Sequence, residues 1–181
     1  MSVTGAPEQP SSSTSPLVVL RPMSEASGRA VLAGEDLPDV RTVPDYPTEF
    51  SAGMAPLVGA GSPLGPWLIH RASDGVAVGD IGGAFTGPGQ VEIGYAVASS
   101  VQGRGYASAA VTALVAYARA DPRIEVLVGH TPLDRPASGR VLRKAGFVAV
   151  GEVDDEHDGQ PLRVTEWRLP LTAPPGAADP S

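Results

Sequence analysis

The chain has 181 residues, a length typical of one domain, and its 42% hydrophobic and 18% charged residues favour a folded globular protein over a disordered one. A formal net charge of -7 argues against nucleic acid and anionic membrane as partners. The sequence contains no cysteine, which excludes disulfides, thiolate metal sites and a cysteine nucleophile.

The two ends of the chain differ in composition from the rest. Residues 1–16 and 172–181 are rich in small residues and proline, so we expect disordered tails around a single domain at 17–171. The start lacks the basic and apolar regions of a signal peptide, and no apolar run approaches about 18 residues. We therefore expect a cytoplasmic protein.

The first part of the domain predicts one strand and two short helices. A β-branched apolar run at 17–20 is typical of a strand. Ser24 is a candidate N-cap for a short helix that ends near Gly34. The prolines within 35–50 exclude a long regular element there, and another short helix is expected at 48–57.

A three-stranded meander is expected next. Strand-like runs at 67–70 and 76–81 flank a turn sequence at 73–75, which predicts a hairpin, and a third strand follows at 91–97.

The last part of the domain alternates helices and strands. Small and apolar residues at helical spacing predict a helix over 105–120. A second helix is expected at 137–145, with strands at 124–128, 147–153 and 162–169. This order predicts a mixed α/β sheet with two crossover helices.

A glycine-rich loop, Gln102-Gly103-Arg104-Gly105-Tyr106-Ala107, lies between a predicted strand and the predicted helix over 105–120. Its glycines permit unusual backbone angles, and the first amides of the following helix have no partner within the helix, which together favour binding of an anion such as a pyrophosphate. A dinucleotide fingerprint is excluded because Ser108 stands where the pattern needs glycine, and a P-loop is excluded because no Gly-Lys-Ser/Thr triplet exists. An ordinary strand-to-helix turn is the remaining alternative.

Three segments in this order, 91–97, 102–107 and 137–147, together resemble the GNAT superfamily of acyl-CoA-dependent N-acetyltransferases. Within that superfamily, the branch of ribosomal-protein N-terminal acetyltransferases looks closest. The resemblance implies an α+β fold with a mixed, mostly antiparallel central sheet, whose fourth and fifth strands splay apart, and flanking helices. Acetyl-CoA, as cosubstrate, would lie between the splayed strands.

The resemblance also implies the residues that hold acetyl-CoA. Main-chain groups of Tyr95, Ala96 and Val97 would bind the pantetheine arm. The loop Gln102, Gly103, Arg104, Gly105, Tyr106 and Ala107 would hold the pyrophosphate. Arg135 stands where the family commonly has an Asn that contacts the cofactor, so it either reaches a CoA phosphate or is solvated.

Two candidate catalytic residues follow from the same resemblance. Glu92 occupies the position of a glutamate that deprotonates the amine, and the alternative is a solvated strand carboxylate. Ser138 occupies the position of a serine near the sulfur and is a candidate general acid, and the alternative is a helix N-cap. Many relatives use a tyrosine where this chain has Leu142.

The acceptor amine is not identified by the sequence. The stretch from 35 to 49 carries five acidic residues against Arg41 alone, which favours a cationic small molecule or peptide as acceptor. A homodimer is left open. No metal is expected, because His70, His130 and His157 lack metal-ligand spacing.

Acidic residues at 154–158 imitate the start of a calcium loop but are better explained as a hairpin turn.

Two other function classes are kept beside the N-acetyltransferase. One is a catalytically inactive acyl-CoA-binding sensor on the same fold, suggested by the missing tyrosine. The other is a nucleotide-binding module unrelated to CoA, which NAD or ATP, but not CoA, would stabilise against heat.

Overall fold

The computed structural model describes residues 16–157 and 160–171. The expected tails, apart from Pro16, lie outside the described residues, as does the tip of the expected turn near residue 158. Among the described residues, no helix is long and apolar enough to cross a membrane.

The strand and the helices expected near the N-terminus are present in the structure. The first strand is β1 (Val18–Pro22) and the first helix is α1 (Glu25–Ala33). Ser24 caps α1 by accepting a hydrogen bond from the amide of Ser27 at 3.0 Å, and Gly34 ends the helix in the left-handed conformation. The second expected helix is shorter, with α2 (Ser51–Met54) followed by the 3₁₀ turn η1 (Ala55–Leu57).

Within 16–157 and 160–171, the sheet has seven strands in the order β1-β2-β3-β4-β5-β7-β6. Only β4 and β5 are parallel, so the expected mixed and mostly antiparallel fold is confirmed. The strands after β1 are β2 (Leu64–Arg71), β3 (Ala77–Gly87), β4 (Gln90–Val97), β5 (Val126–Pro132), β6 (Val148–His157) and β7 (Gln160–Pro170). The remaining helical segments are η2 (Ser99–Val101), α3 (Tyr106–Ala120) and α4 (Pro136–Lys144).

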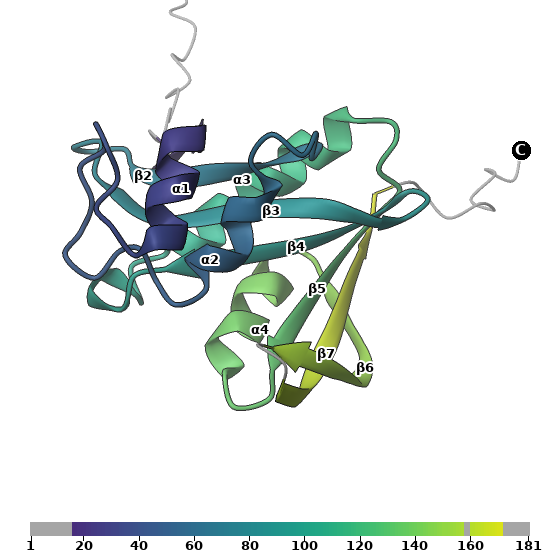
Figure 1. Cartoon of the computed structure of the whole chain (residues 1–181). Helices are drawn as coiled ribbons and strands as arrows, with labels where there is room; N and C mark the ends of the chain where they lie inside the picture. The colour runs from purple at the N-terminus through teal and green to yellow at the C-terminus, as the bar shows by residue number, and fades with distance from the viewer. Residues whose placement is uncertain (1–15, 158–159, 172–181) are drawn as a thin grey trace, which may run out of the picture.

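The sheet forks between β4 and β5. The two strands pair from Gln90, opposite Val126, to Ile93, opposite Gly129, and then continue separately to Val97 and to Pro132. Figure 1 shows them diverging, with α4 beside β5. The splay expected for the fourth and fifth strands is therefore present.

The two faces of the fork are covered by different helices. A Cβ atom added at Gly94 would lie 2.9 Å from Met54 of α2, whereas one added at Gly129 would lie 3.1 Å from Leu142 of α4. Neighbouring residues of a strand point to opposite faces, so Ile93 and Tyr95 lie on the α4 face, and Glu92 lies on the α2 face with Gly94.

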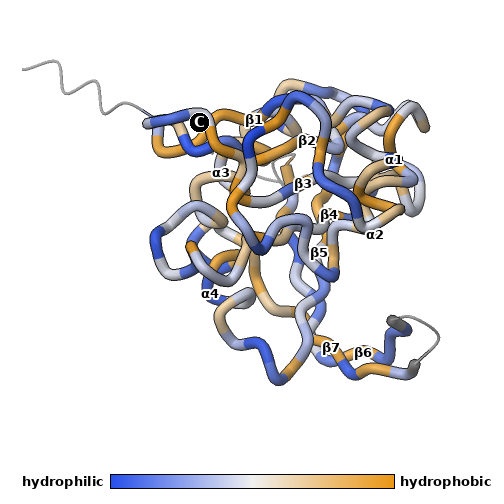
Figure 2. The backbone as a smooth tube through the Cα atoms, turned by 60° about the vertical axis from the view of Figure 1, so that its left-hand side comes forward, coloured by the Kyte–Doolittle hydropathy of each residue, from blue (hydrophilic) through white to orange (hydrophobic). Residues whose placement is uncertain are grey.

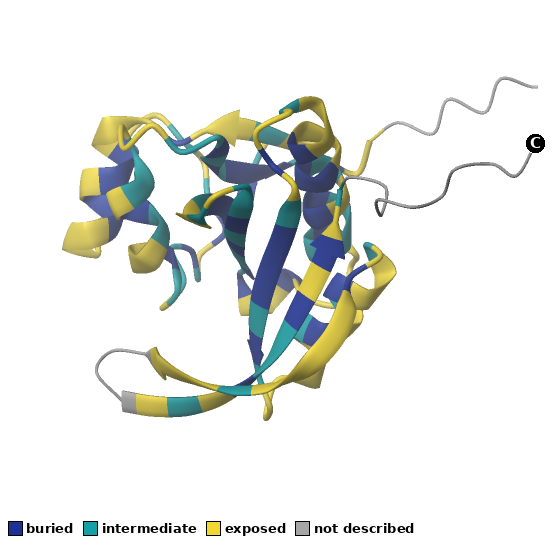
Figure 3. Cartoon of the chain, turned by 90° about the vertical axis from the view of Figure 1, so that its right-hand side faces the viewer, coloured by how far each residue is buried: buried dark blue, intermediate teal, exposed yellow. Residues whose placement is uncertain are grey.

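Helix α3 anchors the sheet behind the fork. Its inward residues Ala110, Val111, Leu114 and Ala118 are completely buried, and the helix contacts β1, β2, β3 and β4. Small residues on this face let the helix approach the sheet closely. The β6–β7 hairpin, in contrast, extends from the body in Figure 2 and is largely exposed along β6 in Figure 3.

The observed bounds of the strands differ from the expected ones, and the differences at β3 and β5 have an identifiable physical cause. β3 runs on through Gly82 and Gly83, which sequence patterns penalise in strands. A Cβ atom at Gly83 would lie 2.8 Å from the carbonyl oxygen of Glu92, so glycine is required by the close approach of β4. β5 begins two residues later and ends four residues later than the predicted 124–128, because Ile124 forms a turn with Asp121.

Asp80 of β3 is a fully buried carboxyl in the core beneath α2. The hydroxyl of Tyr46 donates to its Oδ2 atom at 2.9 Å, and the hydroxyl of Ser51 donates to the same atom, while Oδ1 has no partner among the described residues. Burial raises the pKa of Asp80 above its ordinary value of 3.8.

We expect Asp80→Asn to change the pH dependence of stability. Folding raises the pKa of Asp80, so the protonated carboxyl is favoured in the folded state. Its contribution to stability is present below pH 3.8 and is lost as the pH rises through the raised pKa. The free energy of unfolding of Asp80→Asn, measured with urea, should therefore increase relative to that of the wild type as the pH rises above about 4.

Asp121→Asn is the control, because hydrogen bonds from Arg123 lower the pKa of Asp121 to about 2, so its contribution has the opposite sign. A constant difference between Asp80→Asn and wild type across this pH range would contradict the account.

Candidate functional site

The loop expected to bind an anion has the required backbone geometry. Gly103 and Gly105 both have positive φ angles, of 75° and 85°, which favour glycine. The first backbone bond of α3 joins the amide of Ala109 to the carbonyl of Gly105, and no side chain in the described part of the chain caps the helix. The amides of Tyr106, Ala107 and Ser108 therefore remain available at the positive end of the helix dipole.

The loop side chains divide into exposed and inward ones. Residues 102–105 are exposed, whereas Tyr106 is buried. Nε2 of Gln102 donates to the carbonyl of Val97 at 3.0 Å, so this side chain links the loop to β4. Arg104 is the exposed cation next to the free amides.

The end of β4 offers a free backbone edge to the fork. Tyr95, Ala96 and Val97 pair with β3 on one side, but the pairing with β5 ends at Ile93. Apart from the carbonyl of Val97, which accepts the hydrogen bond from Gln102, main-chain groups on the other side are therefore available to a ligand, as the resemblance implied for this segment.

Glu92 lies beside His130 on the α2 face of the fork. Glu92 is in register with Val128, so His130, two residues further along β5, points to the same face. Nδ1 of His130 lies 3.1 Å from Oε1 of Glu92. The side chain of Glu92 is 42% exposed and that of His130 is 21% exposed, so solvent and ligands can reach the carboxylate.

Two further carboxylates face His130 from the β6–β7 hairpin. Oδ2 of Asp155 lies 3.7 Å from Nδ1, and Oε2 of Glu166 lies 3.7 Å from Nε2. Nε of Arg168 donates to Glu166 at 2.6 Å, and this bond is the largest cause of a lowered pKa of Glu166. The histidine is therefore surrounded by negative charge.

Ser138 lies on the other face of the fork, in the first turn of α4. The hydroxyl of Tyr95 donates to the backbone carbonyl of Ser138 at 2.9 Å, which links β4 to α4 across the fork. Burial raises the pKa of Tyr95. The helix begins at Pro136 with Arg135 in the N-cap position, so the alternative that Ser138 is an N-cap is wrong.

Arg135 contacts the segment between α1 and α2. Its guanidinium lies 3.2 Å from Oε1 of Glu49 and 4.5 Å from the centre of the ring of Phe50. Arg135 therefore connects the start of α4 to the other side of the fork. Whether it also binds a CoA phosphate stays a prediction.

The acidic stretch from 35 to 49 is less free than expected. Asp45 accepts hydrogen bonds from Ser99 and from both the amide and the hydroxyl of Ser100. These bonds, first the one from the Ser100 side chain, lower the pKa of Asp45 to about 2. With Glu49 paired to Arg135, the expectation that these carboxylates face Arg41 alone is corrected.

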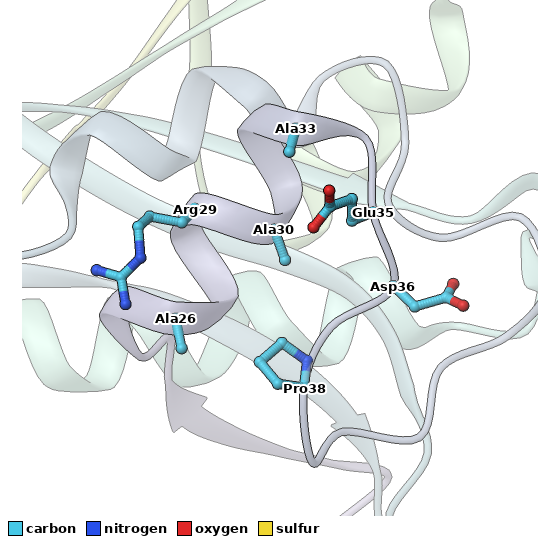
Figure 4. A pocket seen from close by; sticks show the side chains of 7 residues that line it. All are labelled: Ala26, Arg29, Ala30, Ala33, Glu35, Asp36 and Pro38. Atoms are coloured by element: carbon cyan, nitrogen blue, oxygen red, sulfur yellow. The ribbon is translucent and has the colours of Figure 1, made fainter.

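A surface hollow of about 350 Å³ lies elsewhere, on the outer side of α1, as Figure 4 shows. Its lining comes only from α1 and the loop after it: Ala26, Arg29, Ala30, Ala33, Glu35, Asp36 and Pro38. None of the candidate site residues takes part in it.

His130 is the residue that sequence reasoning missed. The spacing of the three histidines in the sequence bears only on metal binding. Strand parity indicates His130 only once the register of β4 with β5 is known. Among the described residues, no three or more His, Asp and Glu side chains are arranged to hold a metal ion. The expectation that the protein uses no metal stays a prediction.

The comparisons with known proteins agree with this fold. The sequence pattern of the family described as Acetyltransferase (GNAT) domain matches residues 18–148, and the chain belongs to this family. The resemblance to the GNAT superfamily is thereby confirmed, and the family fold supports acetyl transfer from acetyl-CoA to an amine. No curated protein sequence matches the chain.

Three solved structures illustrate the shared fold. RimL, a ribosomal L7/L12 alpha-N-protein acetyltransferase in complex with coenzyme A, is 23% identical, with a TM-score of 0.62 over 86% of this chain and 95% of that chain. A spermidine N-acetyltransferase SpeG chimera from Vibrio cholerae and hSSAT is 14% identical, with a TM-score of 0.63 over 86% and 96%. A GNAT-family acetyltransferase from Bacillus anthracis is 19% identical, with a TM-score of 0.53 over 58% and 65%.

Proposed function

We propose that this protein transfers the acetyl group of acetyl-CoA to a primary amine by direct attack, with Glu92 as general base and Ser138 as general acid. The observation that carries the proposal is the fork itself, which places Glu92 on one face and Ser138 on the other beside a free strand edge.

The cofactor side of the proposal rests on backbone groups. The pyrophosphate would accept hydrogen bonds from the free amides at the start of α3, where the helix dipole also favours negative charge. The pantetheine arm would pair with the free edge of residues 95–97, in the way that an added strand would. Bound in this way, acetyl-CoA would have its thioester in the fork.

The chemical roles follow from the two faces. The ammonium form of the acceptor loses a proton to the Glu92 carboxylate, and the free amine attacks the thioester carbonyl. As the tetrahedral intermediate collapses, the C–S bond breaks and the thiolate takes a proton from the Ser138 hydroxyl. Ser138 regains a proton from the positively charged nitrogen, which becomes the neutral amide.

The acceptor is proposed to be a cationic amine, either a small molecule or a peptide N-terminus. Carboxylates on the α2 face support this choice, since Glu92, Asp155 and Glu166 all face His130 there. RimL and SpeG are named for a ribosomal protein and for spermidine respectively, and both acceptors are amines.

A screen for thiol release tests the function. Acetyl-CoA is incubated with the protein and a panel of polyamines, basic peptides and acidic peptides at two ionic strengths. We expect thiol release with cationic acceptors, weakening as salt rises. Binding of acetyl-CoA without release for any amine would instead favour the sensor, consistent with buried Leu142 in place of a tyrosine.

Ser138→Ala is expected to lower kcat by about tenfold or more, because loss of general acid catalysis usually costs at least that much. The free energy of unfolding should change by less than about 0.5 kcal/mol, since Ser138 is not an N-cap. Steady-state kinetics and urea unfolding measure the two effects. Ser138→Cys keeps a proton donor and should retain more activity, whereas unchanged kcat in Ser138→Ala would remove Ser138 from the mechanism.

A further inference from the structure

His130 lies where β4 and β5 separate, one residue beyond the last paired residue of β5, Gly129. The position opposite it on β4 is Gly94, which has no side chain to separate the ring from Glu92. Nδ1 of His130 is 3.1 Å from Oε1 of Glu92, within the range of a hydrogen bond.

The hydrogen bond has a defined direction. An ionised carboxylate only accepts hydrogen bonds, so Nδ1 of His130 must carry the proton in this pair. The surrounding groups agree with this assignment. Asp155, a second carboxylate, also faces Nδ1, which again suits an N–H on that nitrogen, and Glu166 faces Nε2. Arg168 is directed at Glu166 rather than at the ring.

We infer that His130 is a positioning residue for Glu92, an inference that rests on the proposed function. The Nδ1–H group holds Oε1 and so orients the carboxylate, which leaves Oε2 for the ammonium of the acceptor. In the step that follows, the N–H bond of the ammonium breaks and an O–H bond forms on Glu92. His130 gives up no proton and touches no reacting atom.

Fixing the carboxylate raises the rate because a base in the correct orientation needs no reorganisation before it takes the proton. Asp155 lies 3.7 Å from the same nitrogen, beyond hydrogen-bond distance, so it contributes charge but not orientation. This contrast provides a matched control on the same ring.

The kinetic test compares His130→Phe, which removes the donor, with His130→Asn, whose amide nitrogen can take the place of Nδ1. We expect His130→Phe to lower kcat about tenfold or more, with the Kd of acetyl-CoA changed less than about twofold, and His130→Asn to recover most of the loss. Asp155→Asn removes a charge from the acceptor face but no hydrogen bond to the ring, so its effect should appear in the KM of the cationic acceptor rather than in kcat. The loss caused by His130→Phe should nearly vanish in the Glu92→Gln background, because the base is already absent.

Three kinetic results would overturn the inference. These are full activity in His130→Phe, an equal loss in the Glu92→Gln background, or no recovery in His130→Asn. If His130→Phe does not fold, His130→Ala, which also removes the donor, replaces it in both comparisons.

A spectroscopic test is independent of turnover. The chain has three histidines, so ¹H–¹⁵N spectra of the imidazole rings can be assigned with His130→Asn. We expect a protonated Nδ1 on His130 whose signal moves in Glu92→Gln more than in Asp155→Asn. An unprotonated Nδ1, or no response to Glu92→Gln, would overturn the inference even in a protein that acetylates amines. The expected spectra in a protein without acetyl transfer would refute the proposed function alone.

Discussion

Glu92→Gln is expected to lower kcat by about 100-fold or more, since a positioned general base is worth roughly that much, while leaving the affinity for acetyl-CoA unchanged. Gln keeps the size and an oxygen that can accept the His130 hydrogen bond, so the fork should stay intact. The deficit should be greatest at low pH, where more of the acceptor amine is protonated and a base is needed. Stopped assays at several pH values, with calorimetric titration of acetyl-CoA, measure both quantities.

Glu125→Gln is the control for this change. Glu125 is an exposed carboxylate next to β5, and it lies outside the fork. We expect its kcat to match the wild type. A Glu92→Gln enzyme with wild-type kcat at every pH would assign Glu92 to the alternative of a solvated strand carboxylate.

Ala107→Glu should abolish the stabilisation of the fold by acetyl-CoA. The new carboxylate would lie among the free amides at the start of α3 and repel the pyrophosphate there. For the wild type, a ligand at 100 times its Kd adds about 2.7 kcal/mol to the free energy of unfolding, and this gain should be lost. Thermal unfolding with and without acetyl-CoA measures it.

Ala116→Glu is the matched control, because it places the same side chain at an exposed position of α3, away from the loop. This variant should keep the full stabilisation by acetyl-CoA. Equal stabilisation of folded Ala107→Glu and Ala116→Glu would show that the loop does not hold the pyrophosphate.

Elements that depend on local chemistry were predictable from the sequence. Helix α1 begins after Ser24 and ends at Gly34. The side-chain oxygen of Ser24 accepts a hydrogen bond from a backbone amide at the first end, and the left-handed conformation of Gly34 lets its amide bond to backbone carbonyls at the second. Helix α3 follows from its uninterrupted small and apolar residues. The anion loop was recognisable because its glycines and the next helix are adjacent in the chain.

Features that depend on contacts between distant segments were not predictable in the same way. The contact between Glu92 and His130 joins residues 38 positions apart and depends on the parallel register of β4 with β5. The contact of Arg135 with Glu49 spans 86 positions and crosses between the two sides of the fork. No periodicity within either segment indicates such pairs.

The start of α4 is a feature that the sequence did signal. Proline favours the first position of a helix, so Pro136 marks the first turn and puts Ser138 inside the helix. The prediction of a helix at 137–145 missed this signal by one residue. Because the helix begins at Pro136, the Ser138 hydroxyl is not used as a helix cap. It is therefore available for the proposed proton transfer.

Amide hydrogen exchange with and without acetyl-CoA tests most directly whether the fork and the loop form the cofactor site. Some of the amides at 95–97 and 103–108 have no backbone partner, and these unpaired amides should exchange quickly in the free protein. Saturating acetyl-CoA is predicted to slow exchange in both segments and to leave residues 26–38, which line the hollow on α1, unchanged. Protection at 26–38 with none at 95–97 and 103–108 would contradict the account.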